Sequence, residues 1–142
     1  MSVSARNVFK GKITALVDGA VNAEVELTLS GGDKIVAIVT EGSVKSLGLA
    51  VGKEAVAYVK APWVMLLAGV ENVKFSARNQ LAGKVSVLHK GAVNTEVGVK
   101  LVGGTTVFAV VTNEAVLELG LKEGADATAL IKASHVILGV PA

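Results

Sequence analysis

The sequence predicts an all-β protein made of two tandem OB-like five-stranded barrels, each with a short helix between its third and fourth strands. An internal repeat is the first reason, because the tetrapeptide Ser-Ala-Arg-Asn at positions 4–7 returns unchanged at positions 76–79. At this offset of about 72 residues, roughly 30 of about 67 positions are identical, which identifies a tandem repeat. The second reason is a strict alternation of apolar and polar residues. The third is a composition of 51% hydrophobic and 18% charged residues, which favours a packed β core.

The first half of each repeat is predicted to form two strands joined by a tight turn. Residues 7–17 are rich in β-forming residues and contain Gly11, which marks a bulge or a bend; Gly83 takes its place in the second repeat. After a turn at 18–19, apolar residues alternate with polar ones over residues 21–29, as in a half-buried strand. The second repeat follows the same rhythm.

A hairpin and a capped helical turn are predicted to follow. The Gly-Gly pairs at 31–32 and 103–104 are read as hairpin turns rather than phosphate cradles, and the first leads into a β-branched strand at 34–39. Thr40 is predicted to cap the start of a short helix, and Gly48 is predicted to end it. The second repeat preserves both of these features.

Residues 54–60 and 63–68 are predicted as the fourth and fifth strands of the first barrel. The two domains are expected to span residues 1–69 and 74–142. Units of this size bury a limited core, so we expect them to pack on each other or on other subunits. The connection at 69–74 is too short to act as a free tether, and so the two barrels should be in contact.

Composition and charge exclude several classes of function. The net charge of +2 is too small for a nucleic-acid footprint, and the absence of cysteine excludes disulfides and thiolate metal sites. The N-terminus lacks the apolar segment of a signal peptide, and the apolar run at 64–70 is too short to span a bilayer. We therefore expect a soluble cytoplasmic protein with no membrane partner.

No group of residues in the sequence matches a known catalytic arrangement. The two histidines, His89 and His135, have no counterparts in the other repeat, so surface or packing roles are expected for them. The sequence contains no Walker loop, no zinc-binding spacing and no serine-centred motif. We therefore expect a protein that is not an enzyme.

Polar residues retained in both copies are the best candidates for a binding site, because tandem copies diverge freely at solvated positions. They are Ser4, Arg6, Asn7, Thr40 and Lys60, with Ser76, Arg78, Asn79, Thr112 and Lys132. Nearly all of them can donate hydrogen bonds, and no carboxylate recurs among them. A site of donors alone favours a fully deprotonated oxyanion, such as sulfate, molybdate or tungstate, over hydrogen phosphate. Taken singly, each residue also has a structural explanation as a strand start, a helix cap or a solvated charge.

A second repeated feature is a turn of small residues. It consists of Gly19, Ala20, Val21 and Asn22 in the first copy, and of Gly91, Ala92, Val93 and Asn94 in the second. Small residues allow backbone N–H groups to approach an anion or another chain closely. A tight β-turn packed at an interface is an equally good interpretation from the sequence alone.

Several short motifs together resemble the molbindin (Mop) family. They are Ser-Ala-Arg-Asn, Gly-Lys, Gly-Ala-Val-Asn-Ala-Glu-Val, Val-Thr before Leu-Gly-Leu, and Val-Lys-Ala-Pro-Trp-Val-Met. Their order and spacing recur, so that two copies cover nearly the whole chain, as in a double-repeat (di-Mop) molbindin. The resemblance implies binding of molybdate and tungstate, storage and homeostasis of molybdenum in the cytoplasm, and a homotrimer that contains six Mop domains.

The same resemblance implies which residues hold the oxyanion. The implied molybdate-binding residues are Ser4, Ala5, Arg6, Asn7, Thr40, Ser43, Lys60, Ala61, Ser76, Ala77, Arg78, Asn79, Thr112, Lys132 and Ala133. In related sensor domains the ion lies between units, and Thr40 and Ser43 would come from a neighbour. The second copy departs from this pattern at Ala115, which lacks the hydroxyl of Ser43. Further anion sites on a threefold axis are implied near the Gly-Ala-Val-Asn turns. No residue is expected to coordinate the metal atom directly.

Three functions follow from these observations as alternatives. The first is an oxyanion-binding storage protein. The second is a molybdate-sensing regulatory module that acts with a transcription or transport partner, against which we set the lack of an attached DNA-binding or ATPase domain. The third, a nucleic-acid-binding OB module, is disfavoured because one Trp, one Tyr and three Phe offer few platforms for base stacking. We therefore expect no nucleic-acid partner.

Overall fold

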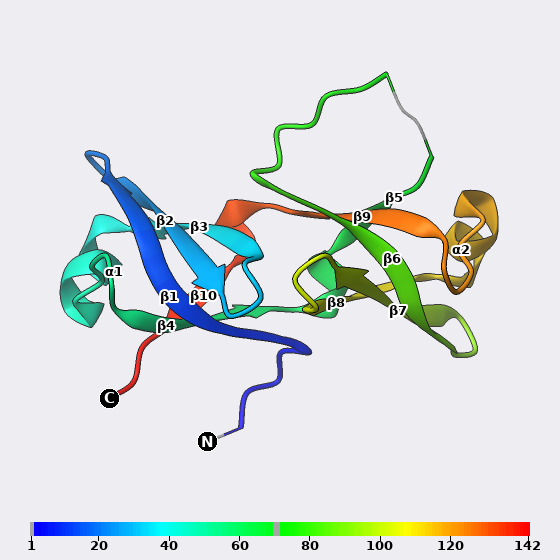
Figure 1. Cartoon of the computed structure of the whole chain (residues 1–142), viewed down its shortest axis with the longest axis horizontal. Helices are drawn as coiled ribbons and strands as arrows, with labels where there is room; N and C mark the ends of the chain where they lie inside the picture. The colour runs from blue at the N-terminus through cyan, green and yellow to red at the C-terminus, as the bar shows by residue number, and fades with distance from the viewer. Residues whose placement is uncertain (1, 70–71) are drawn as a thin grey trace.

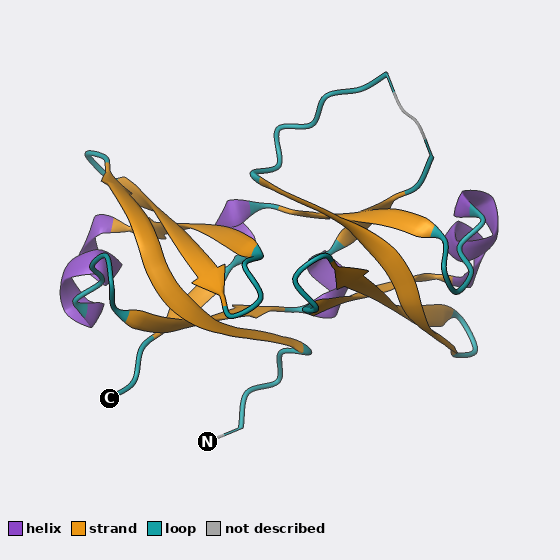
Figure 2. Ribbon diagram, viewed as in Figure 1, coloured by secondary structure: helices purple, strands orange, loops and turns teal. Residues whose placement is uncertain are grey.

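The computed structural model describes residues 2–69 and 72–142, and it confirms a mostly β protein with two similar halves (Figure 1, Figure 2). The first repeat contains β1 (Asn7–Asp18), β2 (Asn22–Leu29), β3 (Lys34–Thr40), α1 (Glu41–Leu47), β4 (Glu54–Val59), the 3-10 turn η1 (Ala61–Trp63) and β5 (Met65–Leu67). The second contains β6 (Asn79–Lys90), β7 (Asn94–Leu101), β8 (Thr106–Thr112), α2 (Asn113–Leu119), β9 (Asp126–Ile131), the 3-10 turn η2 (Ala133–His135) and β10 (Ile137–Gly139). Both repeats have the predicted helix between their third and fourth strands. Residues 70–71 of the predicted connection lie outside the described residues.

The strands form two five-stranded sheets, and the fifth strand of each sheet comes from the other repeat. The strand orders are β10-β4-β1-β2-β3 and β5-β9-β6-β7-β8. β5 is antiparallel to β9, where Met65 lies opposite Leu130, and β10 is antiparallel to β4, where Ile137 lies opposite Tyr58. In Figure 1 the red C-terminal strand accordingly lies among the strands of the first repeat.

This exchange corrects the prediction that residues 63–68 complete the first barrel. A strand of 3 residues does form there, but it pairs with the sheet of the second repeat. The fourth strands of the two repeats present similar edges, so the sequence alone cannot tell which of them so short a strand will join. The boundaries at 1–69 and 74–142 stay a prediction for the repeats in sequence, while strand pairing crosses between them.

The long first strand of each repeat contains a register shift that lies close to a glycine in the sequence. The pairing of β1 with β2 shifts its register between Ile13 and Ala15, just after Gly11. A Cβ on Gly11 would collide with the main-chain carbonyl of Thr28 on β2, and Gly83 is confined in the same way. The irregularity predicted near this glycine is therefore present, and it bends the strand around the core.

Both short helices have the predicted caps. The Thr40 hydroxyl accepts a hydrogen bond from the Ser43 N–H at 3.1 Å, and Gly48 follows the helix with a φ of 64°. In the same way, Thr112 caps the start of α2 by accepting a hydrogen bond from the Ala115 N–H, and Gly120 follows its end. Because each cap satisfies a helix N–H group, helix geometry fixes the positions of both threonines.

One hydrophobic core runs through both repeats. Its buried members include Phe9, Ile13, Val25, Leu27, Ile35, Val59, Val85, Val97, Val99, Val107, Ile131 and Val136. Alternate residues of β2 are buried, as the period-two pattern predicts. Because this core is continuous and the fifth strands are exchanged, each repeat depends on the other for its packing.

Candidate functional site

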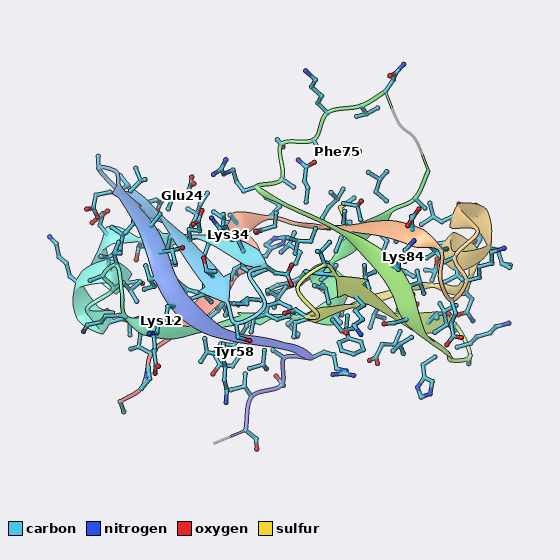
Figure 3. The ribbon with its side chains drawn as sticks, in the orientation of Figure 1. Lys12, Glu24, Lys34, Tyr58, Phe75 and Lys84 are labelled. Atoms are coloured by element: carbon cyan, nitrogen blue, oxygen red, sulfur yellow. The ribbon has the colours of Figure 1, made fainter. Side chains whose placement is uncertain are left out.

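Each arginine of the repeated tetrapeptide reaches a glutamate of the other repeat. Arg6 donates from Nε to Glu96 Oε2 at 3.3 Å and from Nη2 to Glu96 Oε1 at 3.4 Å. The Arg6 guanidinium also lies 3.6 Å from the centre of the Phe108 ring, a cation–π contact. Arg78 donates to Glu24, which projects from β2 and is labelled in Figure 3. Glu24 is the counterpart of Glu96, so the two pairs are reciprocal.

These ion pairs correct the prediction of a site made of donors alone. Glu24 and Glu96 recur at the repeat offset, but the alternating pattern suggested only that they lie on the solvent face of a strand. An arginine has five N–H donors, and Arg6 uses two of them on Glu96. Each glutamate therefore orients a guanidinium that can still donate to an anion.

The asparagine of the tetrapeptide clamps the two repeats together. Asn7 is 1% exposed; its Nδ2 donates to the Phe108 carbonyl at 2.8 Å, and its Oδ1 accepts from the Phe108 N–H at 2.7 Å. Asn79 makes the same pair of bonds with Val36, both at 2.8 Å. Because both amides are engaged with main chain, their side chains serve to position the neighbouring Ser-Ala-Arg residues.

The two 3-10 turns lie where the repeats meet, and they position the predicted lysines and alanines. Lys60 and Lys132 directly precede η1 and η2 and are exposed, whereas Ala61 and Ala133 are buried. Trp63 and His135 occupy equivalent positions, and their rings pack against each other with centres 5.1 Å apart and planes tilted by 39°. This contact gives His135 a packing role.

One cavity brings together several predicted ligands of the second copy. It has a volume of about 270 Å³ and is lined by Trp63, Met65, Phe75, Ser76, Ala77, Leu130, Lys132 and His135. The polar groups of this mainly apolar lining are the Ser76 hydroxyl, the Lys132 ammonium and the His135 imidazole, and the first two can donate hydrogen bonds to a small anion. Two larger grooves, of about 530 and 710 Å³, are not lined by any predicted site residue.

Thr40, Ser43 and Thr112 lie apart from this cavity. They sit at the starts of α1 and α2, and these helices stand at opposite ends of the molecule (Figure 1). The Thr40 and Ser43 hydroxyl oxygens are 2.9 Å apart, while Ala115 offers no such group in the second copy. Within the described part of a single chain, these hydroxyls and the cavity do not form one site.

The Gly-Ala-Val-Asn turns have the same main-chain geometry in both repeats. The Gly19 N–H donates to the Asn22 carbonyl at 2.9 Å, and the Gly91 N–H donates to the Asn94 carbonyl at 2.7 Å. The valines of the two turns are 73% and 69% exposed. The tight β-turns are therefore present, and a role in anion binding stays a prediction.

Two carboxyl groups of the first repeat have shifted pKa values. Burial raises the pKa of Glu41, and the neighbouring Asp18 carboxyl raises it further. A hydrogen bond from the Thr14 hydroxyl lowers the pKa of Glu26, and Lys34, 3.4 Å away, acts in the same direction. Sequence reasoning gave Glu41 no role, because its counterpart in the second repeat is Asn113.

Within residues 2–69 and 72–142, no group of three or more His, Cys, Asp or Glu side chains is placed to hold a metal ion. Over the same two ranges, no helix is both long enough and apolar enough to cross a membrane. The chemistry that these residues do offer is hydrogen-bond donation, from paired arginines, exposed lysines and hydroxyl groups.

Comparison with known proteins places this chain among molybdenum-binding relatives. The TOBE domain model matches residues 3–66 and again residues 76–138. The molybdenum-pterin-binding protein MopA of Rhodobacter capsulatus is 45% identical over 141 residues, which cover 99% of this chain and 53% of MopA. The molybdenum transport protein ModE of Azotobacter vinelandii is 44% identical over 140 residues, which cover 99% of this chain and 52% of ModE. This chain thus spans about half the length of the curated relatives MopA and ModE.

A solved structure also matches the whole chain. It is a crystal structure of the cytoplasmic molybdate-binding protein ModG with molybdate bound, with a TM-score of 0.94 and 60% sequence identity. The match covers 99% of this chain and 100% of ModG, and it confirms both the fold and the resemblance to double-repeat molbindins. The chain therefore belongs to the TOBE domain family, whose model it matches once in each repeat.

Proposed function

We propose that this protein binds molybdate, and also tungstate, as the intact oxyanion, and thereby stores and buffers molybdenum in the cytoplasm. The observation that carries the proposal is the cavity that gathers Ser76, Ala77 and Lys132 on a chain that aligns over 99% of its length with molybdate-bound ModG. The protein would bind and release the ion without turnover. Its relatives are binding proteins, which supports this part of the proposal.

The donor chemistry suits a tetrahedral dianion. Molybdate is fully deprotonated near neutral pH and can only accept hydrogen bonds, so a guanidinium, an ammonium and a hydroxyl all complement it. Hydrogen bonds to a charged group contribute about 1.5–3 kcal/mol each, so a few of them suffice for useful affinity. Ala5, Ala61, Ala77 and Ala133 have no polar side chain and would contribute through main-chain N–H groups.

The proposed sites lie between chains of a homotrimer with six Mop domains. Each would combine Ser4, Arg6 and Lys60, or their counterparts in the second repeat, with the threonine at the start of a helix on a neighbouring chain. Thr40 and Thr112 are not among the residues that line the cavity of Ser76 and Lys132, and this separation supports the arrangement. So do the exposed apolar residues Trp63, Met65 and Ile137, which lie on or next to the exchanged strands β5 and β10 and which an oligomer would bury.

Isothermal titration of molybdate into an Arg6→Ala and Arg78→Ala double variant tests the proposal. Loss of these donors is expected to weaken binding at least about tenfold, because a tenfold change corresponds to about 1.4 kcal/mol. The matched control is Lys12→Ala with Lys84→Ala, which removes two other repeated, exposed cations that lie outside the site (Figure 3). Equal affinities for the two double variants would refute the role of the arginines.

A second candidate function is a molybdate-sensing module that acts with a transcription or transport partner. The 44% identity to ModE, a protein about twice as long, favours it. Affinity capture of the tagged protein from cells grown with and without molybdate distinguishes the two. A partner recovered in fixed ratio and only in one condition supports sensing, and recovery of the protein alone supports storage.

We also propose that this chain itself makes no contact with nucleic acid. Such contacts need exposed aromatic platforms beside a basic track, and this sequence has 4% aromatic residues and a net charge of +2. A gel-shift assay with single-stranded and duplex DNA at low salt should show no retarded band. A band that persists at moderate salt would contradict this part of the proposal.

A further inference from the structure

The cavity that contains Ser76 and Lys132 has one wall without regular secondary structure. Its other walls are well fixed, because β5 pairs with β9 and the His135 N–H donates to the Lys132 carbonyl at 2.9 Å within η2. Residues 75–77 form the remaining wall and lie in the connection that leads into β6. In Figure 1 residues 72–78 run outside the two sheets before β6 begins. This wall therefore needs bonds other than those of a strand ladder to keep its position.

The side chain of Gln80 provides such bonds. Its Nε2 donates to the Phe75 carbonyl at 3.1 Å and to the Ala77 carbonyl at 3.0 Å. Gln80 itself belongs to β6, whose main chain pairs with β9, so it is a fixed point of attachment. Within the described part of the chain, no main-chain hydrogen bond outside the helices and strands involves residues 72–78. Because Ser76 lies between the two bonded carbonyls, the Gln80 amide restrains this proposed ligand on both sides (Phe75 is labelled in Figure 3).

The first repeat has no equivalent of this amide. Val8 stands where Gln80 does, and its side chain has no group that can donate to the main chain of residues 3–5, the counterparts of residues 75–77. Val8 is 46% exposed, so the fold of a single chain does not require an apolar side chain there. The two copies thus carry the same proposed serine and arginine ligands on segments that are restrained differently.

The restraint on this wall should act on rates more than on affinity. An ion that is bound by the Ser76 hydroxyl is released when residues 75–77 move, and each such movement breaks both hydrogen bonds of Gln80. The neighbouring Arg78 and Asn79 keep their own bonds to the first repeat without Gln80, so the wall stays in place for most of the time. Affinity depends on the fraction of the protein that is competent to bind, and this fraction changes little when it is already close to one.

We propose that Gln80 is a positioning residue for the oxyanion site of the second copy, where it slows the entry and the release of the ion. The first copy, with Val8 at this position, exchanges its ion faster. This inference rests on the proposed function and adds a difference in exchange rate between the two copies that does not depend on their affinities. For a protein that stores molybdenum, the consequence is one pool that is released quickly and another that is retained longer.

Replacement of bound molybdate by tungstate measures these rates. The full chain is loaded with molybdate and mixed with excess tungstate, and the molybdenum that remains bound is determined over time by rapid filtration and metal analysis. The wild type should release molybdenum in a fast and a slow phase. In Gln80→Val, which introduces the first-copy residue, the slow phase should become about tenfold faster, a change that corresponds to about 1.4 kcal/mol. In Val8→Gln the fast phase should become slower, and in both variants the affinity should change by less than about twofold.

A control variant and a measurement without ligand separate positioning from a folding defect. Lys84→Val also replaces an exposed polar residue of β6 by valine, but it lies outside the cavity and should change neither phase. Backbone order parameters from NMR of the free protein should fall at residues 75–77 in Gln80→Val. Those of the buried strand residues Val97 and Val99 should stay as in the wild type.

The outcomes distinguish this inference from the proposed function. A wild type that releases all its molybdenum in one phase, rates that neither Gln80→Val nor Val8→Gln changes, or an equal change in Lys84→Val would overturn the inference and leave the proposed function intact. Unchanged order parameters at residues 75–77 would overturn it as well. A protein that binds no molybdate in any variant would overturn the proposed function, and this inference with it. Opposite changes in the two phases, with affinities close to that of the wild type, would support the inference.

Discussion

Arg6 of the first repeat is held by Glu96 of the second through two hydrogen bonds, of 3.3 and 3.4 Å. Arg78 and Glu24 form the reciprocal pair. The two repeats also exchange strands, because β5 joins the sheet of the second repeat and β10 joins the sheet of the first. Each repeat therefore supplies part of the framework around the proposed binding residues of the other. A change in one repeat is therefore expected to affect both.

Replacement of Asn7 by Ala should destabilise the whole chain. The Phe108 N–H and carbonyl would lose their partners in a buried setting, and each unsatisfied group costs about 1–3 kcal/mol. Asn79→Ala should cost a similar amount, because its two bonds to Val36 match in length. Urea unfolding measures both effects, and Asn72→Ala, at an exposed position in the connection, serves as the control. Midpoints equal to the wild type would show that the amides do not clamp the repeats.

Alanine at Gly11 should also destabilise the protein, for a steric reason. The added Cβ would collide with the Thr28 carbonyl, and overpacking of this kind typically costs about 1–3 kcal/mol. Gly42→Ala in α1 is the matched control, because its new Cβ would meet only the Thr40 hydroxyl, at 3.7 Å. That change should be neutral or stabilise the helix by up to about 1 kcal/mol. Thermal unfolding that ranks the two variants in the reverse order would contradict the close strand contact at Gly11.

The strands and caps could be predicted from the sequence because their causes are local. Alternation of apolar and polar residues defines β2 by itself, and Thr40 and Gly48 define the ends of α1 by their own hydrogen bonding and backbone freedom. The repeat strengthened each prediction, since the same pattern occurred twice. The fifth strand was different, because its position depends on which of two similar edges it joins.

The candidate site was predictable only in part, for a related reason. Repetition identified Arg6 and Arg78, but the partners that orient them lie across the interface between repeats, where sequence spacing gives no information. Glu24 and Glu96 are identical at the repeat offset, as the two arginines are, so a comparison of the acidic residues in the two copies identifies them as candidates. Glu41 could not be found by repetition, because Asn113 stands at its position in the second repeat and the burial that raises the pKa of Glu41 is visible only in the structure.

The stability of the protein should depend on pH through Glu41. Its pKa is raised in the folded state, so the folded protein holds this proton more tightly than the unfolded chain does. The resulting stabilisation is fully present below the ordinary value of 4.5 and is lost as the pH rises through the folded-state pKa. Glu41→Gln should therefore be more stable than the wild type near neutral pH, and the difference should shrink under acidic conditions.

Chemical unfolding at several pH values measures this difference. Glu114→Gln is the control, because this carboxylate is exposed in the first turn of α2, where it should stabilise the helix slightly at neutral pH. The two variants are thus expected to change stability in opposite directions at neutral pH. A Glu41→Gln protein that is less stable than the wild type near pH 7 would show that the ionised carboxylate is well accommodated.

Exchange of Ser43 and Ala115 should alter molybdate affinity with little effect on folding. The helix cap at Thr40 uses the Ser43 N–H, which remains in Ser43→Ala, so only the hydroxyl 2.9 Å from the Thr40 oxygen is lost. If the protein has the proposed function, this substitution removes one hydrogen-bond donor from half of the interface sites. The molybdate affinity of those sites should then fall by up to about tenfold. Ala115→Ser should raise the molybdate affinity of the other half by a comparable factor.

Titration of the wild type is therefore expected to resolve two classes of interface site that differ in affinity. In each single variant the two classes should become one. The contradicting result is a wild-type isotherm with a single class of site that neither variant changes. It would mean that the hydroxyl at this position does not face the ion, because the loss of a direct donor must lower the affinity.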